Sequence, residues 1–245
     1  MNPNSQSMPS LPEVASIATA TTMRRDARIA GALYVTVIAG GLFVGIVQDS
    51  LTVIGDAAAT AAAIAGHELL WRWGIAVHLI YLATATTMMN VLLYRIFKPV
   101  QPTLALLALV SGIVSAAIEG AALLPLYLPL GMAELRGVLP AVGEVTRQEF
   151  VYLGIHLSEI GFGIALFFFS GFCAAIGSAI VRSRLLPRII GAMMILAGVC
   201  YFVSSLSNVV APAFAHLLSP WIIVPCFLGE TSLAIWLLFK GTRST

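Results

Sequence analysis

Charged residues are scarce in this chain: they make up 10% of its 245 residues, against 59% that are hydrophobic. Soluble domains usually carry about 25% charged residues, and the mean hydropathy of +0.97 is far from that of a soluble domain. No basic run is longer than Arg24-Arg25, which excludes a nucleic-acid-binding face of the usual kind. The composition predicts an integral membrane protein whose partner is the lipid bilayer and not a nucleic acid.

Several motifs of membrane enzymes are missing as well. The chain has no H-E-x-x-H motif of a zinc protease, and its aspartates, at positions 26, 49 and 56 only, cannot supply an intramembrane dyad. Four histidines are too few for a histidine-box desaturase, and Lys98 and Lys240 lie at span ends, not where a retinal Schiff base needs a lysine. The three cysteines form no C-x-x-C pair, so we expect them to be packing residues. No specific motif indicates a cofactor.

Six stretches are long and apolar enough to cross a bilayer, for which about 20 residues are needed. They cover residues 29–47, 73–94, 103–127, 151–181, 188–210 and 221–239. We predict an all-α fold, a polytopic bundle of six transmembrane helices in a membrane domain of residues 24–245. Residues 1–23 are rich in Ser, Thr, Pro and Asn and lack hydrophobic periodicity, which predicts a disordered cytoplasmic tail.

Basic residues are distributed unequally between the two sides of this topology. Ten lie on one side and three on the other, which accounts for all 13. Because loops rich in Lys and Arg stay in the cytoplasm, both termini are predicted to be cytoplasmic. The ten are Arg24, Arg25, Arg28, Arg95, Lys98, Arg182, Arg184, Arg188, Lys240 and Arg243.

The two long outer connections, Gln48–Arg72 and Pro129–Phe150, could form a cap or could be passive links. In the first, Asp56 is placed to cap a short Ala-rich helix that ends near Gly66. In the second, residues 135–145 mix apolar with charged residues and could lie in the membrane interface.

Ionisable residues inside the apolar stretches are the best indication of a site, because charge in hydrocarbon needs a partner, a proton or a function. Most of them fall in the outer part of their spans, and His156 and Glu159, three apart, share a helix face. We predict a polar pocket that opens outward, with Glu230 as its floor. Its members are Glu119, Glu230, His156, Glu159, His78 and Asn208.

The charges of this set do not balance, because no Lys or Arg is predicted in the hydrocarbon. Three carboxylates face two imidazoles, so the pocket should hold a protonated glutamate, a bound cation or both. The same residue types bind Zn or Fe, and two histidines could ligate a haem, so a metal site stays open. Its candidate ligands are His78, His156, Glu119, Glu159 and Glu230. Two bland alternatives are that His156 and Glu159 only reach the headgroups and that the glutamates only bridge helices.

Three functions remain after these exclusions. The first is the binding or movement of a small amphipathic ligand or lipid headgroup by the Glu/His pocket. The second is a membrane-embedded enzyme, metal-dependent or acid–base, that acts on a lipid or isoprenoid; no catalytic residue is specified. The third is a structural or accessory subunit. Gly41 and Gly45 form a G-x-x-x-G pattern that could also support a homodimer.

The second half of the chain contains recognisable segments: HLSEIGFG at 156–163, VRSRLLPRIIG at 181–191 and GETSLAIWLLFK at 229–240. RIAGALY at 28–34, GDAAA at 55–59 and LYRIFKP at 93–99 fit the same pattern. Together they resemble a bacterial membrane family, the domain of unknown function 4386, over about residues 28–241. The resemblance implies a multi-pass protein of the bacterial inner membrane. It carries no established activity, and Glu230 and His156 match its recurrent polar positions.

Overall fold

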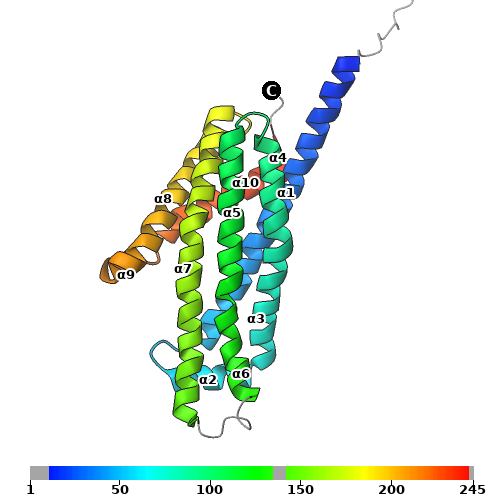
Figure 1. Cartoon of the computed structure of the whole chain (residues 1–245). Helices are drawn as coiled ribbons and strands as arrows, with labels where there is room; N and C mark the ends of the chain where they lie inside the picture. The colour runs from blue at the N-terminus through cyan, green and yellow to red at the C-terminus, as the bar shows by residue number, and fades with distance from the viewer. Residues whose placement is uncertain (1–10, 135–141, 243–245) are drawn as a thin grey trace, which may run out of the picture.

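The computed structural model describes residues 11–134 and 142–242, and this part of the chain is helical with no strand (Figure 1). The predicted all-α class is therefore confirmed. The helices are α1 Leu11–Leu51, α2 Ala57–Gly66, α3 Glu68–Tyr81, α4 Thr87–Phe97, α5 Pro102–Ala122, α6 Leu128–Glu134, α7 Glu144–Ser183, α8 Arg188–Val210, α9 Pro212–Leu218 and α10 Ile223–Phe239. A π-helical segment, Leu82–Thr86, joins α3 to α4, and a 3-10 helix, Leu124–Tyr127, joins α5 to α6.

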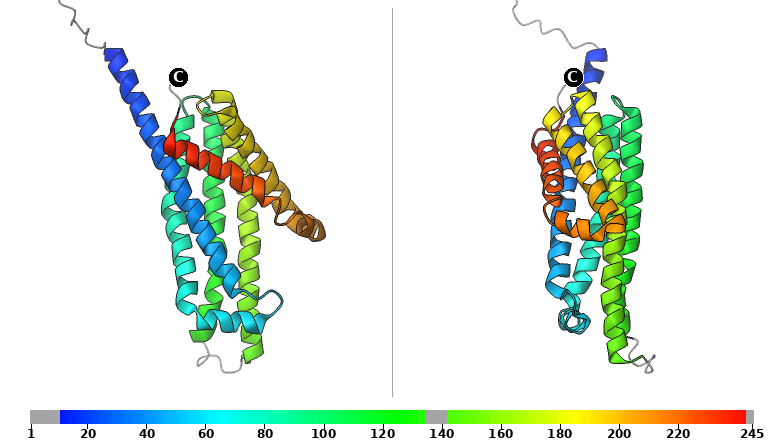
Figure 2. Two further views of the ribbon diagram at one scale, coloured as in Figure 1. Left: turned by 180° about the vertical axis from the view of Figure 1, so that it is seen from behind. Right: turned by 90° about the vertical axis from the view of Figure 1, so that its left-hand side faces the viewer.

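Five of these helical segments are long and apolar enough to cross a membrane, one fewer than the sequence predicted. The five are Thr21–Leu51, Glu68–Phe97, Pro102–Met132, Glu144–Ser183 and Arg188–Val210. The predicted sixth span corresponds to α10, which starts only at Ile223, after a turn, and has 17 residues. At 1.5 Å per residue it is about 26 Å long, just short of the roughly 30 Å hydrocarbon core. It packs obliquely between α1 and α8 (Figure 2).

Helix α1 starts within the tail that the sequence predicted for residues 1–23. Its first residue is Leu11, and it extends past the rest of the bundle (Figure 1). Residues 11–25 include Ala, Leu, Glu, Met and Arg, which have a high intrinsic helix propensity. Residues 1–10 and most of the predicted interfacial segment, at 135–141, lie outside the described residues.

The first long connection forms an ordered cap; of the two predicted alternatives, a cap or a passive link, the structure shows the cap. Helix α2 ends at Gly66, and the Asp56 side chain accepts a hydrogen bond from the Ala59 amide at 2.8 Å, which confirms the predicted N-cap. The buried Thr60 hydroxyl donates to the Asp56 carbonyl, also at 2.8 Å. Helix α2 lies across the end of the bundle that is remote from the C-terminus and packs on α7 (Figure 1).

Close glycine contacts set the register of α7 against α8. A Cβ atom on Gly177 would lie 2.6 Å from the Gly191 carbonyl oxygen, and one on Gly198 would lie 2.8 Å from that of Ser170. In this antiparallel register, Val210 at the end of α8 is close to the level of Glu159 on α7. The first turns of α7 therefore continue beyond the end of α8, and α9 sits part-way along α7 (Figure 1).

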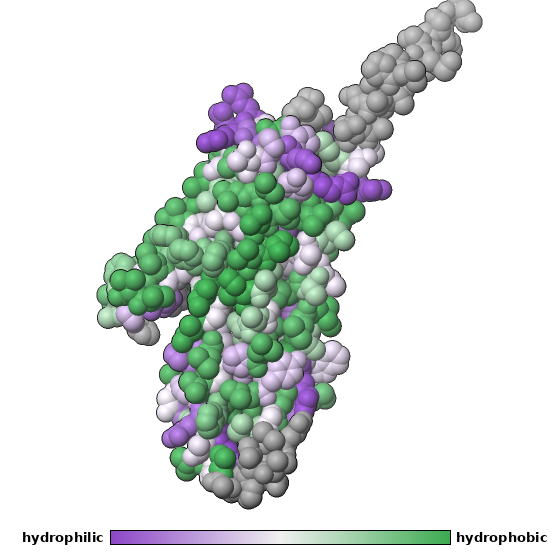
Figure 3. Space-filling view, viewed as in Figure 1, coloured by the Kyte–Doolittle hydropathy of each residue, from purple (hydrophilic) through white to green (hydrophobic). Residues whose placement is uncertain are grey.

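The uncharged part of α7 matches the length of α8. Helix α7 has 40 residues and is about 60 Å long, twice the thickness of the hydrocarbon core. Residues 160–181 contain no charged residue and alone are about 33 Å long. On the face shown in Figure 3, the middle of the molecule is largely hydrophobic, hydrophilic residues gather at the end of the bundle where the C-terminus lies, and the other end has mixed polarity.

Candidate functional site

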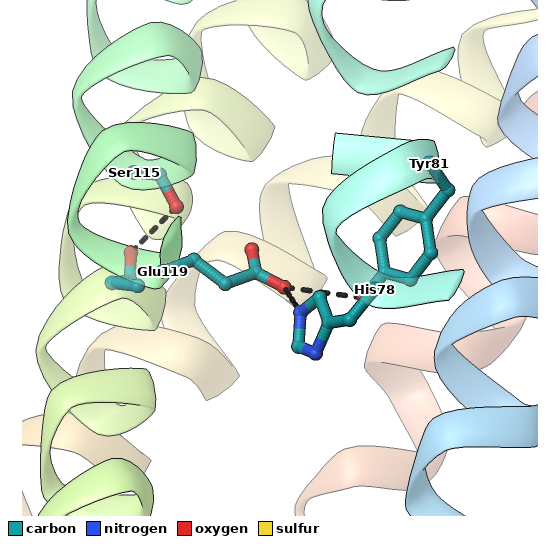
Figure 4. Close-up of polar contacts among 5 residues, drawn as sticks. His78, Tyr81, Ser115 and Glu119 are labelled. Atoms are coloured by element: carbon teal, nitrogen blue, oxygen red, sulfur yellow. Dashed lines mark hydrogen bonds and ion pairs between the residues drawn. The ribbon is translucent and has the colours of Figure 1, made fainter. Parts of the chain in front are cut away.

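His78 and Glu119 form a close pair that joins α3 to α5. The His78 Nε2 atom lies 2.7 Å from Oε1 of Glu119, and the Tyr81 hydroxyl donates to the same oxygen at 3.3 Å (Figure 4). His78 and Tyr81 are three residues apart, so they share one helix face, and their rings stack with centroids 5.0 Å apart. Only 8% of the His78 side chain and 17% of the Glu119 side chain are exposed.

Helices α3 and α5 pack mainly on other helices, so side chains make the contact between them. Helix α5 packs mainly on α7 and α4, whereas α3 packs mainly on α1. Ser115, one turn before Glu119, donates to the Ala165 carbonyl at 2.8 Å and holds α5 on α7 (Figure 4). Tyr81 lies against Gly40 of α1, where a Cβ would be 2.6 Å from the Tyr81 ring. The His78–Glu119 pair thus connects a helix held by α1 to a helix held by α7.

An apolar cluster separates the pair from the end of the bundle that carries α2. The Trp71 indole donates to the Leu126 carbonyl at 3.0 Å and ties α3 to the 3-10 helix. Because Trp71 precedes His78 by two turns and Leu126 follows Glu119 by two turns, this layer lies between the pair and α2. Its members are Val47, Leu51, Ile64, Trp71, Ile75, Leu123, Leu126, Leu130, Val151 and Ile155.

Glu230 occupies a second polar centre, formed by α1, α8 and α10. Its Oε1 accepts a hydrogen bond from the Tyr201 hydroxyl at 2.5 Å, and its Oε2 accepts one from the Tyr34 hydroxyl at 3.1 Å. The adjacent Gly229 lets α10 approach α8, since a Cβ there would lie 2.9 Å from the Met193 carbonyl oxygen. Both carboxyl oxygens therefore have a donor, each from a different helix.

The remaining predicted site residues lie apart from these two centres. His156 and Glu159 do share a face of α7, with Nδ1 and Oε2 3.5 Å apart, but 63% and 65% of their side chains are exposed. Asn208 is exposed at the end of α8 and donates to the Ser204 carbonyl at 3.0 Å. The predicted pocket residues therefore divide into two buried centres and two exposed positions. Within the described residues, no group of three or more His, Cys, Asp or Glu residues is placed to hold a metal ion.

Three tyrosines complete the two centres, and the predicted list of pocket members did not include them. Tyr81 contacts Glu119, while Tyr34 and Tyr201 contact Glu230. Their signal in the sequence was a phenol inside an apolar stretch, where the hydroxyl needs a hydrogen-bond partner. Which carboxylate each would reach depended on helix pairing.

The π-helical segment Leu82–Thr86 begins four residues after His78 along the chain. Such segments are rare and are frequent near functional sites. Buried polar atoms before, within and after this segment lack a hydrogen-bond partner among the described residues: Nδ1 of His78, Oγ1 of Thr86 and Oδ1 of Asn90. Since buried polar atoms are normally satisfied, the free imidazole nitrogen gives the His78–Glu119 pair one further hydrogen-bonding position. A His–Glu pair can both donate and accept hydrogen bonds, so it can bind a polar group that is either an acceptor or a donor.

Replacing Tyr201 with phenylalanine should lower the free energy of unfolding by about 1–2 kcal/mol, because one Glu230 oxygen loses its buried donor. Thermal unfolding of the detergent-solubilised protein would measure the change. Tyr127→Phe is the matched control, since Tyr127 is exposed and should change stability by less than about 0.5 kcal/mol. Equal effects of the two substitutions would contradict a role of Tyr201 in holding Glu230.

These features define the class of the protein: an all-helical bundle whose apolar helices are suited to a membrane, with polar residues buried at helix contacts. The chain belongs to the family described as domain of unknown function DUF4386, whose model matches residues 29–241, most of the chain. This confirms the resemblance seen in the sequence. Comparisons with curated proteins and with solved structures gave no match.

Proposed function

We propose that the protein binds the polar group of a small amphipathic ligand, such as a lipid headgroup, at the His78–Glu119 pair. We further propose that it crosses the bacterial inner membrane six times, with α10 as the short sixth span and both termini in the cytoplasm. Basic residues support this orientation, because Arg95, Lys98, Arg184 and Arg188 belong to the connections at the end of the bundle where the C-terminus lies, and hydrophilic residues gather at that end (Figure 3). Glu119 would then lie just inside the outer boundary, one turn deeper than Glu159.

The observation that carries the proposal is the side-chain bridge between α3 and α5. Glu119 keeps 17% of its side chain exposed, so the pair is partly accessible, and Leu79 and Ile80 are exposed further round α3. The Trp71–Leu126 layer blocks the direct way from the outer end. A ligand with an apolar tail would approach from the bilayer and place its polar group at the partly exposed Glu119, next to His78, whose buried Nδ1 has no partner among the described residues.

A structural role is the better assignment for Glu230. Both of its carboxyl oxygens accept a tyrosine hydroxyl, and the three residues come from three different helices. This arrangement satisfies the buried carboxyl without any ligand. The second centre then holds α10 against α1 and α8, while the first remains able to bind.

We expect Glu119→Gln and His78→Gln each to lose a co-purified amphipathic ligand. The affinity for that ligand should fall about tenfold or more, because hydrogen bonds to charged groups are worth about 1.5–3 kcal/mol. Native mass spectrometry of the gently solubilised protein would identify the ligand, and titration back into delipidated protein would give its affinity. Glu159→Gln is the matched control, since that carboxylate is exposed. Unchanged ligand content in both pair variants would refute the proposal.

A further inference from the structure

A groove with a volume of about 380 Å³ lies at the connection between α7 and α8, at the basic end of the bundle. Its volume is within the range of small-molecule sites, about 300–1,000 Å³. Two arginines and three apolar residues line it: Arg184, Leu186, Pro187, Arg188 and Ile189. The groove is at the opposite end of the bundle from the α2 cap, so it is separate from the His78–Glu119 pair.

The backbone of this connection holds the two arginines in place. Leu185 and Leu186 are each 1% exposed and are anchored in the main hydrophobic core. Arg184, just before them, adopts a left-handed backbone conformation with φ of 58°, which is uncommon for a residue with a side chain. The connection therefore buries both leucines while Arg184 and Arg188 stay exposed on either side of them.

No described acidic residue neutralises the positive charge of the groove. Within the part of the chain that the structure describes, no acidic side chain forms an ion pair with Arg184 or Arg188. Arg95, at the same end of the bundle, differs: its Nη2 atom lies 3.1 Å from Oδ2 of the buried Asp26. Arginine is well suited to bind phosphate, because its planar guanidinium donates two parallel hydrogen bonds.

An exposed apolar stripe on α8 starts at the edge of this groove. Ile189, which lines the groove, is 66% exposed, and the stripe continues at helical spacing along one face of α8. Its residues are Ile189, Ala192, Leu196 and Val199. An anionic headgroup in the groove would therefore have its acyl chains beside an apolar surface that leads away from the basic end.

From the groove, its two exposed arginines and the adjoining stripe, we infer that the α7–α8 connection binds an anionic phospholipid. The lipid phosphate lies between Arg184 and Arg188, and an acyl chain lies along the stripe. Basic pockets between membrane helices bind such headgroups, and each Lys or Arg near an anionic membrane surface contributes about fivefold to binding. The lipid would anchor the connection that orients α8, which carries Tyr201.

Native mass spectrometry of the full chain, titrated with phosphatidylglycerol or phosphatidylcholine, tests this inference. The wild type should bind phosphatidylglycerol about tenfold or more tightly than phosphatidylcholine. Arg184→Gly and Arg188→Gln should each weaken phosphatidylglycerol binding about fivefold, and the double variant about 30-fold. Arg184→Gly suits the left-handed backbone, so the fold should be retained, as the melting temperature in detergent would verify.

Lys98→Gln is the matched control, because it removes one exposed positive charge at the same end but outside the groove. It should leave phosphatidylglycerol binding within about twofold of the wild type. Equal loss in Lys98→Gln, or no preference of the wild type for phosphatidylglycerol, would overturn the inference in favour of diffuse surface charge. Inorganic phosphate alone should not raise the melting temperature; an increase that the arginine variants abolish would overturn the lipid as the ligand in favour of free phosphate.

Discussion

Replacing Gly31 with alanine is expected to force α1 away from α10 and to lower the free energy of unfolding by about 3 kcal/mol. A Cβ at this position would lie 2.3 Å from the Leu238 backbone nitrogen and 2.8 Å from the Ala234 carbonyl oxygen. These are backbone atoms of a packed helix, so no side chain can rotate out of the way, and the whole contact has to shift. Thermal unfolding in detergent, followed by circular dichroism, would measure the loss.

The same helix provides the control for this substitution. A Cβ on Gly45 would meet no atom within 4 Å, so Gly45→Ala should be neutral or stabilising by up to about 1 kcal/mol from helix propensity. Gly31 also lies one turn before Tyr34, so the alanine variant should weaken the Tyr34–Glu230 hydrogen bond. A melting temperature of Gly31→Ala equal to that of Gly45→Ala would show that α1 and α10 are not packed this closely.

Replacing His78 with leucine is expected to cost about 3 kcal/mol, because it leaves the largely buried Glu119 carboxyl group with the Tyr81 hydroxyl as its remaining hydrogen-bond donor among the described residues. Removal of one partner of a buried charged pair typically costs about 3–5 kcal/mol. The double variant His78→Leu/Glu119→Gln should recover at least about 1 kcal/mol, since it has no charge left to bury. A double-mutant cycle on unfolding free energies would measure this coupling.

The exposed pair on α7 provides the comparison. His156→Leu removes a histidine at the same spacing from a glutamate partner, but both side chains are exposed, so the expected loss is no more than about 0.5 kcal/mol. If His78→Leu were as mild as His156→Leu, the His78–Glu119 pair would not be what joins α3 to α5. If the double variant were additive, the two residues would act independently.

The two buried centres differ in a way that matters for function. Glu230 has a tyrosine donor on each oxygen, and it lies beside tight glycine contacts of α1 and α10 and of α8 and α10. Glu119 has both of its contacts on one oxygen, is partly exposed and joins helices that otherwise pack on different partners. A ligand could displace or extend the contacts of Glu119 with less disturbance of the helix packing than at Glu230.

Local features of this protein could be predicted from the sequence. The bounds of α8 agree with the predicted span at residues 188–210, because the Pro187–Arg188 start and the long apolar stretch are local signals. The Asp56 cap of α2 was predictable for the same reason, since an N-cap acts only a few residues along the chain. The pairing of His156 with Glu159 followed from their spacing alone.

Only the tertiary structure decided which polar residues belong to the Glu119 centre, which belong to the Glu230 centre and which are exposed. Hydropathy places a residue along its own helix, but it does not say which face meets which neighbour, and so it could not separate Glu119 from Glu230 or predict their tyrosine partners. The exposure of His156 and Glu159 depends on which face of α7 meets its neighbours, since Ile155 and Ser158, next to them in the chain, are buried. Composition and local spacing determined that this is a helical chain for an apolar environment. Contacts between residues far apart in sequence decided which of its buried charges has a vacant hydrogen-bonding position, because such positions are filled across helix interfaces and not along a helix.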